Sequence, residues 1–119
     1  MFKFFKKEDI DNKLAEAVSK KLHLESKEYD LVAFDKFFGS FIFLLAISNK
    51  KGHVYSSDDK KNILEINISE FDNISIQKKI DMNLYLRNGK FINLTTVVGV
   101  KPKVVNQVRA LNEEINRLR

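Results

Sequence analysis

The side chains best suited to proton transfer near neutral pH are two histidines, His23 and His53. A catalytic histidine needs a nucleophile or a carboxylate within hydrogen-bond reach, and no spacing along the chain pairs either histidine with one. His23 falls at the end of a predicted helix, and His53 follows the turn glycine Gly52, so both are expected to have structural or solvent-facing roles. The sequence therefore predicts no catalytic residues and a protein that is not an enzyme.

Metal and cofactor sites are not predicted either. Cysteine is absent, so the chain has no thiolate ligand, no thiol nucleophile and no disulfide. The segment Ser57-Asp58-Asp59 lacks the further oxygen ligands of a calcium loop. The four glycines are too scattered to build a phosphate-binding loop. We expect no metal and no cofactor.

The N-terminal segment carries the most suggestive binding pattern. Phe2, Phe4 and Phe5 are interleaved with lysines, and aromatic rings beside lysines can seat at a membrane interface. The same rings can instead bind a partner protein, or fold back on the domain as the entry to the first helix. Phe2, Phe4 and Phe5 are therefore candidate binding residues, with the folded-back arrangement as the structural alternative.

Two lysine pairs, Lys50-Lys51 and Lys60-Lys61, form a second candidate surface. They flank a short predicted strand, and if they converge on one rim they could hold phosphate groups. The net charge of +5 favours anionic partners in general, although lysines also keep small domains in solution. Only Tyr55 is interleaved with these pairs. The hairpin aromatics Tyr85 and Phe91 could stack bases, but outward Tyr and Phe on strands more often pack, so nucleic acid is not the expected partner.

The elements that must position these residues follow from the hydrophobic pattern. Apolar residues recurring at steps of three and four predict a helix over Glu8–Leu24, with Asp9 as its N-cap. Between residues 29 and 98 the period is two, which predicts about seven short antiparallel strands. Asn88-Gly89 is the strongest hairpin signal among them. Residues 102–118 then form an amphipathic C-terminal helix.

One predicted strand, Phe41–Ser48, is apolar at nearly every position. A sheet with one wet face needs apolar residues only at alternate positions, so both faces of this strand should be covered. The first helix is the simplest cover, and a second copy of the chain in a homodimer is the other. The length of 119 residues fits a single domain over residues 1–119.

Four segments together give the chain a likeness to a known family. They are Leu44-Leu45-Ala46-Ile47-Ser48-Asn49-Lys50-Lys51, the strand Ile63 to Ile68 leading to Ile74, the hairpin around Asn88-Gly89, and the helix Val104 to Leu118. In this order they resemble the pleckstrin-homology superfold, and most closely the small bacterial PH-like domains. The resemblance covers residues 29–119 and implies an α+β fold. That fold is a PH-like rolled antiparallel sheet of about seven strands, capped by the C-terminal helix, with residues 1–24 as an added N-terminal helical extension.

The resemblance implies a binding scaffold, because family members dock peptides, proteins or lipid head groups. Head-group-binding members place several Lys or Arg around the first hairpin, whereas the turn Phe38-Gly39-Ser40 has only Lys36 close by. We therefore expect a non-enzymatic interaction module that binds a protein partner in the bacterial cytoplasm. The alternatives are peripheral binding to an anionic membrane through the Phe/Lys N-terminus and weak nucleic-acid binding through the lysine pairs. The longest apolar run is far shorter than the ~20 residues of a membrane-spanning helix, and the N-terminus does not match a secretory signal.

Overall fold

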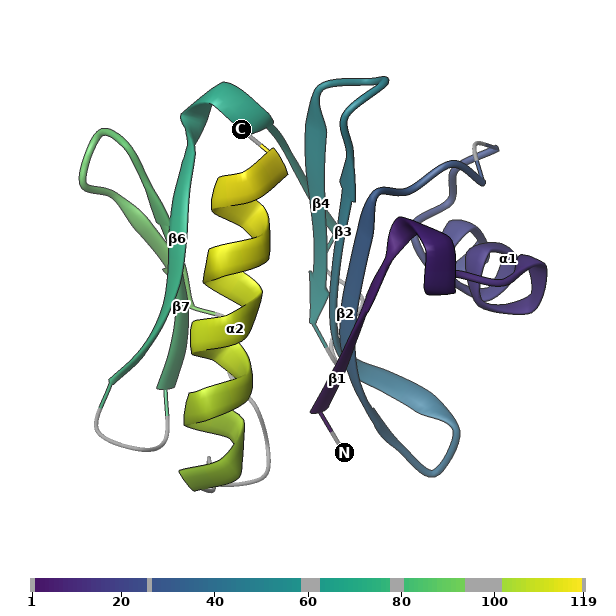
Figure 1. Ribbon diagram of the computed structural model, residues 1–119, viewed down its shortest axis with the longest axis horizontal. Coiled ribbons are helices and arrows are strands. Elements are labelled where there is room, and N and C mark those ends of the chain that lie inside the picture. Colours follow the sequence, from purple (N-terminus) through teal and green to yellow (C-terminus); the bar gives the residue numbers. More distant parts are fainter. Residues whose placement is uncertain (1, 26, 59–62, 78–80, 94–101, 119) are drawn as a thin grey trace.

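Eight strands and two α-helices make up the part of the chain that the computed structural model describes, residues 2–25, 27–58, 63–77, 81–93 and 102–118 (Figure 1). The first five strands form one antiparallel sheet in sequence order: β1 (Phe2–Lys6), β2 (Leu31–Phe37), β3 (Ser40–Ser48), β4 (His53–Asp58) and β5 (Ile63–Asn67). The last three form a second antiparallel sheet: β6 (Phe71–Gln77), β7 (Asp81–Leu86) and β8 (Phe91–Asn93). Helix α1 (Asn12–Lys21) lies between β1 and β2 in the sequence, and helix α2 (Pro102–Leu118) follows β8.

The α+β class and the two helices are as predicted, but the strands do not form one rolled sheet of about seven. The chain leaves the first sheet at a 3-10 turn, η2 (Ile68–Glu70), which interrupts the extended backbone between β5 and β6. At this turn the Ile68 amide donates to the Gly52 carbonyl at 2.8 Å, on the side of the first sheet. Within the described residues β5 and β6 therefore share no ladder, and the two sheets are separate.

The larger hydrophobic core lies between the two sheets and α2. Alternate residues of β3, namely Phe43, Leu45 and Ile47, point into this core and are almost completely buried. Ile74 of β6 and Leu84 of β7 meet them from the second sheet. We call this cluster the inner core. The inner core buries one face of the five-stranded sheet.

The opposite face of the same sheet is covered by α1. The intervening β3 residues Leu44 and Ala46 belong to a second buried cluster, to which α1 contributes Ala15 and Val18, and the residue after its end, Leu22, also belongs. We call this cluster the outer core. The prediction that the first helix covers the second face of the apolar strand is confirmed.

The first helix is shorter than predicted. It begins at Asn12 rather than Glu8, because Asp11, not Asp9, is the N-cap, and its carboxylate accepts a hydrogen bond from the Leu14 amide at 2.7 Å. The residues before it form a single 3-10 turn, η1 (Lys7–Asp9). The helix ends at Lys21, and His23 takes a left-handed conformation with φ 55° in the turn that follows.

The N-terminal segment is a strand, which the sequence analysis did not predict. β1 pairs with β2 over its whole length, with Phe2 opposite Asp35 and Lys6 opposite Leu31. The Phe2 ring is buried in the inner core and stacks on Phe43 with 5.9 Å between ring centroids. The segment that was predicted to be a helical extension therefore contributes β1 to the first sheet as well as α1.

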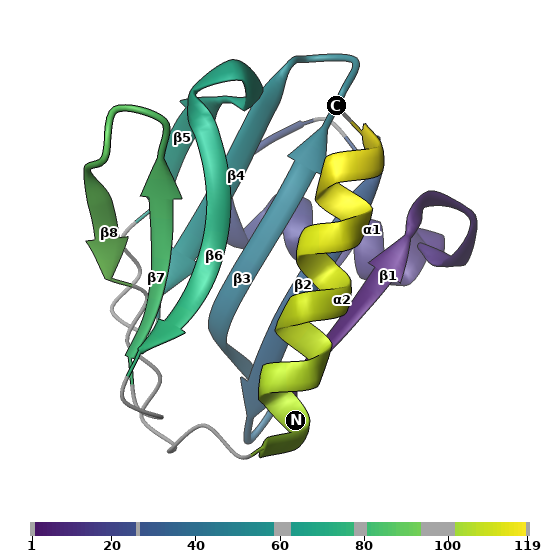
Figure 2. The ribbon, with the colours of Figure 1, turned by 60° about the vertical axis from the view of Figure 1, so that its left-hand side comes forward.

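Helix α2 packs against two edge strands, β6 of the second sheet and β1 of the first. Figure 2 shows α2 lying between these two edges. Its buried residues Val108, Leu111 and Ile115 follow the predicted helical spacing. Lys6 of β1 forms an ion pair with Glu114 at 3.2 Å. Among the described residues, neither helix has the combination of length and apolar character needed to cross a lipid bilayer.

Candidate functional site

The tip of the β2–β3 hairpin carries the most exposed large apolar side chain of the described residues. Phe38 is 92% exposed, and together with Gly39 it forms a two-residue turn in which both residues have positive φ, 51° and 79°. The hairpin extends beyond the body of the protein at the lower right of Figure 1. This turn geometry matches the right-handed twist of the two strands, but it suits Asn or Gly better than Phe at the first position. The left-handed conformation costs a non-glycine residue roughly 1–2 kcal/mol.

Aromatic rings continue from this tip along the α1 side of the first sheet. Phe5 and Phe34 stack at 5.8 Å, and Phe34 meets Phe41 edge-on at 5.6 Å. The Lys36 ammonium lies 5.5 Å from the Phe34 ring centroid and 4.6 Å from that of Phe41, so it caps these rings through cation–π contacts. Lys3, paired with Phe34 across the ladder, is also exposed. We call Lys3, Lys36 and Phe38 the hairpin-tip site.

The three predicted N-terminal rings do not form one surface. Phe2 is 2% exposed, so it is a core residue and cannot contact a membrane or a partner while the sheet is intact. Phe4 is half-buried against the inner core, and Phe5 is half-buried against the outer core, on the other face of the sheet. The alternation of a β-strand sends successive residues to opposite faces, which separates them. The folded-back alternative describes these residues best.

The structure describes only one of the two lysine pairs. Lys50 and Lys51 are exposed in the turn between β3 and β4, and Lys50 forms an ion pair with Glu28 at 3.0 Å. Lys60 and Lys61 lie outside the described residues. The convergence of the two pairs on one rim therefore stays a prediction.

Sequence spacing missed one pair of groups that the sheet register creates. His53 Nδ1 lies 2.7 Å from a Glu65 carboxylate oxygen and 3.4 Å from the Tyr55 hydroxyl oxygen. β4 and β5 pair Tyr55 with Glu65, which brings Glu65 close to His53. The twelve residues that separate His53 from Glu65 along the chain do not reveal this register. Burial raises the pKa of Tyr55, and the charge of Glu65 and then nearby Tyr29 raise it further.

The His53–Glu65 pair can hold a proton at Nδ1 and orient the imidazole ring. Glu65 lies on β5, the edge strand of the first sheet, and about half of its side chain is exposed. Its contact with His53 joins β5 to β4. Within the described part of the chain, no three His, Asp or Glu side chains gather in a way that could hold a metal ion.

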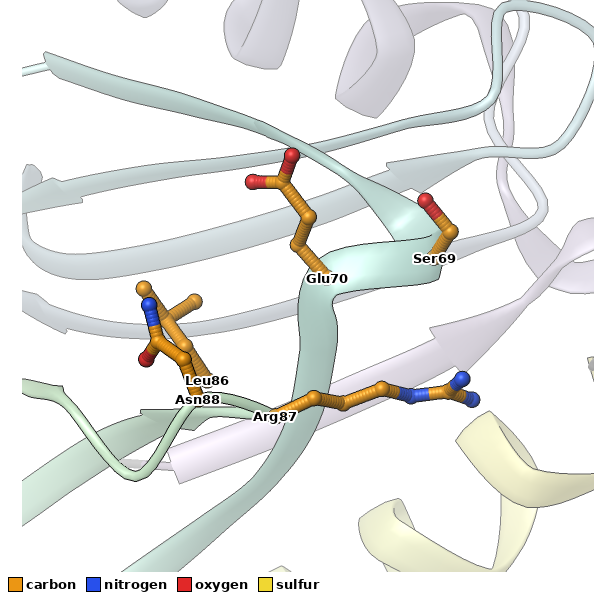
Figure 3. A pocket seen from close by; sticks show the side chains of 5 residues that line it. All are labelled: Ser69, Glu70, Leu86, Arg87 and Asn88. Atoms are coloured by element: carbon orange, nitrogen blue, oxygen red, sulfur yellow. The ribbon is translucent and has the colours of Figure 1, made fainter.

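A small depression lies where η2 meets the β7–β8 hairpin. It has a volume of about 190 Å³ and is lined by Ser69, Glu70, Leu86, Arg87 and Asn88 (Figure 3). The Arg87 amide donates to the Glu70 carbonyl at 2.9 Å, which fixes the two segments together. In Figure 3 the Glu70 carboxylate and the Arg87 guanidinium point away from each other. Ligand pockets usually measure roughly 300–1,000 Å³, so this depression is small for an organic ligand.

Comparisons with known proteins return no relative. No family model matches the chain, and neither the curated proteins nor the solved structures contain a match to it. The geometry of the described residues is therefore the basis for a functional assignment, and its most distinctive feature is the hairpin-tip site.

Proposed function

We propose that this chain is a non-enzymatic, PH-like interaction module that binds a protein partner, with Phe38 as the anchor of the contact. The observation that carries this proposal is the conformation and exposure of Phe38, an aromatic ring held almost fully in water on a turn residue with φ 51°. Backbone strain at a residue whose side chain is almost fully exposed is a reason to look for a functional role.

The energetics of the turn support the proposal that Phe38 anchors a contact with a partner protein. Phe38 gains almost nothing from burial in the isolated chain, and its left-handed backbone costs roughly 1–2 kcal/mol. Burying a Phe side chain in a partner's pocket returns about 1.5–3 kcal/mol. Buried aromatic anchors dominate the affinity of many protein–protein interfaces. A two-residue turn also holds the ring on a rigid support, which limits the entropy lost on binding.

The arrangement of the elements supports the PH-like part of the proposal at the level of architecture. Two antiparallel sheets with a C-terminal helix along their edges are compatible with such a scaffold, and in PH-like proteins the scaffold serves binding. Fold-level likeness alone does not assign a partner. The choice of a protein partner rests on the projecting Phe38 ring, whose shape suits a complementary pocket.

Site-specific photo-cross-linking tests the proposal. A photoreactive phenylalanine analogue replaces Phe38 in living cells, and the same analogue at the exposed ring position Phe91 serves as the matched control. We expect position 38 to cross-link to one discrete protein that position 91 does not capture. A product containing only two copies of this chain identifies a homodimer instead, and the absence of a discrete product at position 38 contradicts the proposal.

A point variant gives the quantitative test once the partner is purified. Phe38→Asn retains a residue that favours this turn, so the fold should be at least as stable. Its affinity for the partner should fall about 10- to 150-fold, the equivalent of losing about 1.5–3 kcal/mol of ring burial. Unchanged affinity in Phe38→Asn would show that the contact lies elsewhere.

The hairpin-tip site also favours a second candidate, peripheral binding to an anionic membrane. Lys36 lies two residues before Phe38, and Lys3 is exposed opposite Phe34 on the same side of the sheet. A lysine near an anionic surface contributes about 1 kcal/mol. With one inserted Phe the sum is roughly 3.5–5 kcal/mol, which corresponds to a weak, millimolar-range association. Co-sedimentation with phosphatidylcholine vesicles with and without phosphatidylglycerol separates the candidates. Binding that requires the anionic lipid and is lost in Phe38→Asn favours the membrane.

A further inference from the structure

The outer face of the second sheet brings six uncharged side chains together in two cross-strand rows. Directly paired residues in an antiparallel sheet lie on the same face, so the register defines the rows. One row is Asn73, Tyr85 and Phe91, and the other is Ser75, Asn83 and Asn93. We call these six residues the aromatic–amide face. β8 forms the outer edge of this sheet (Figure 2).

The two rings of this face point away from the inner core. Leu84 and Ile92, which alternate with Tyr85 and Phe91 along β7 and β8, pack into the inner core. The rings of Tyr85 and Phe91 lie 5.4 Å apart with 39° between their planes. Phe91 is 57% exposed, so the expectation that this ring is packed away is wrong. A neighbouring pair of aromatic rings is thus presented on a sheet surface.

Amides complete the second row beside the rings. The Asn93 side-chain amide donates to the Asn83 side-chain oxygen at 2.9 Å, which fixes the orientation of both groups. Asn83 is only 4% exposed, so of this pair only the exposed Asn93 can present its amide group to a ligand. Amide groups carry donors and acceptors that match the edges of nucleobases. Aromatic rings accept stacked bases with little dependence on sequence, since every base has a π-face.

Charge complementarity decides the class of ligand. The six residues of the aromatic–amide face include no carboxylate. Lys90 is exposed directly before Phe91, and Arg87 is exposed at the other end of the same hairpin loop, which joins β7 to β8. Asp72 lies on β6 next to Asn73, at the other end of the row from Phe91. Glu70 lines the same depression as Arg87, but its carboxylate points away from the Arg87 guanidinium (Figure 3). The net charge of the whole chain is +5.

We propose that the aromatic–amide face binds single-stranded nucleic acid, with bases stacked on Tyr85 and Phe91 and phosphates near Arg87 and Lys90. This site belongs to the second sheet, whereas the hairpin-tip site belongs to the first, so the inference goes beyond the proposed function and does not depend on it. The lysine pairs considered from the sequence take no part in it.

Fluorescence anisotropy with the full chain tests the site. The probes are labelled oligothymidylate and oligouridylate of about 12 nucleotides and a DNA duplex of equal length, at about 50 mM salt. We expect both single strands to bind more tightly than the duplex, and the two single-strand probes distinguish DNA from RNA. Phe91→Ala should weaken binding about 5- to 150-fold. The control is Val105→Ala, which truncates an exposed apolar side chain on α2 and should leave the affinity unchanged.

Two further measurements report on the ring and the cations separately. The chain has no Trp, so its emission comes from tyrosine, and stacking on Tyr85 should quench part of it. Tyr85→Phe should remove that quenching while keeping the affinity, because phenylalanine also stacks. Arg87→Ala and Lys90→Ala should each reduce the salt slope of binding by about 0.7. Equal binding of duplex and single strand, an unaffected Phe91→Ala variant, or no binding at low salt overturns the proposal.

Discussion

The side chain of Asn112 on α2 makes both hydrogen bonds that a neighbouring strand would make to the backbone of Ile74 on β6. The Asn112 Oδ1 accepts from the Ile74 amide at 3.0 Å, and its Nδ2 donates to the Ile74 carbonyl at 2.7 Å. β6 is an edge strand, and unpaired edges expose backbone groups that can pair with other chains. One amide side chain on the C-terminal helix therefore closes part of this edge and fixes α2 against the second sheet.

Replacing Asn112 should show how much this contact stabilises the fold. Asn112→Ala removes two hydrogen bonds, each worth about 0.5–1.5 kcal/mol net, so the free energy of unfolding should fall by about 1–3 kcal/mol. The control is Asn106→Ala at an exposed position of the same helix, which experiences the same gain in helix propensity. Urea denaturation of both variants measures the difference. Equal stability of the two variants would show that the Asn112–Ile74 contact contributes nothing.

The N-terminal strand should be essential for stability. Phe2→Ala leaves a cavity in the inner core beside Phe43, and such truncations cost about 3–5 kcal/mol. Lys3→Ala, at the adjacent exposed position of β1, should change the free energy of unfolding by less than about 0.5 kcal/mol. Chemical denaturation compares them. If Phe2→Ala unfolds at the same urea concentration as the wild type, Phe2 is not a core residue.

Removing a buried hydroxyl should stabilise the protein. Ser56 is 1% exposed, and its hydroxyl has no hydrogen-bond partner among the residues that the structure describes. It lies on β4 opposite Leu45 and Leu64, where an unpaired polar group costs about 1–3 kcal/mol. Ser56→Ala should therefore raise the midpoint of urea unfolding, whereas the exposed Ser69→Ala should leave it in place. A lowered midpoint in Ser56→Ala would mean that the hydroxyl has a partner, for example a buried water.

Stability should fall at alkaline pH through two buried tyrosines. Burial raises the pKa of Tyr29 above its ordinary value of 10.0, although the Ser19 hydrogen bond lowers it in part, and burial also raises the pKa of Tyr55. The unfolded chain then releases these protons at lower pH than the folded one. The contribution is intact below about pH 10 and declines above it, by up to about 1.4 kcal/mol per pH unit for each tyrosine.

The Tyr29→Phe variant isolates the contribution of Tyr29. Near neutral pH it should be less stable by about 1 kcal/mol, because the Ser19 hydroxyl loses its 2.7 Å partner. Above about pH 10 the stabilities of the variant and the wild type should converge, since only the wild type has this proton to lose. Urea unfolding as a function of pH, with tyrosinate absorbance as the second readout, measures both effects. A constant difference between them across this range would contradict the assignment.

The two hairpin turns show which turn features the local sequence predicts and which it does not. The Asn88-Gly89 hairpin is at the predicted place, and Gly89 has the expected positive φ of 86°. Its loop is longer than two residues, because the Leu86 amide bonds to the Lys90 carbonyl at 2.8 Å. The two-residue turn with two positive φ values is instead Phe38-Gly39, which no turn preference for phenylalanine predicts. Strand pairing on both sides imposes that conformation.

The candidate sites show a similar limit. The sequence identified Phe2, Phe4 and Phe5 as unusual, but their alternation with lysine is too short to distinguish a membrane anchor from a strand. Whether such a segment becomes β1 depends on a free edge of β2, which lies some 25 residues later in the chain. The exposure of Phe38 and Phe91 likewise depends on which faces the helices and sheets cover.

The sequence by itself determined the α+β class, the seven strands that the structure describes between residues 31 and 93, and the burial of the apolar face of α2. These features depend on the periodicity of apolar side chains, which is a local property of the chain. Only the tertiary structure decided that the strands divide into two sheets, that β1 completes the first, that His53 meets Glu65, and that Asn112 closes the edge of β6. Each of these depends on register and on contacts between distant segments, and the hydrophobic pattern of one segment does not specify its partner.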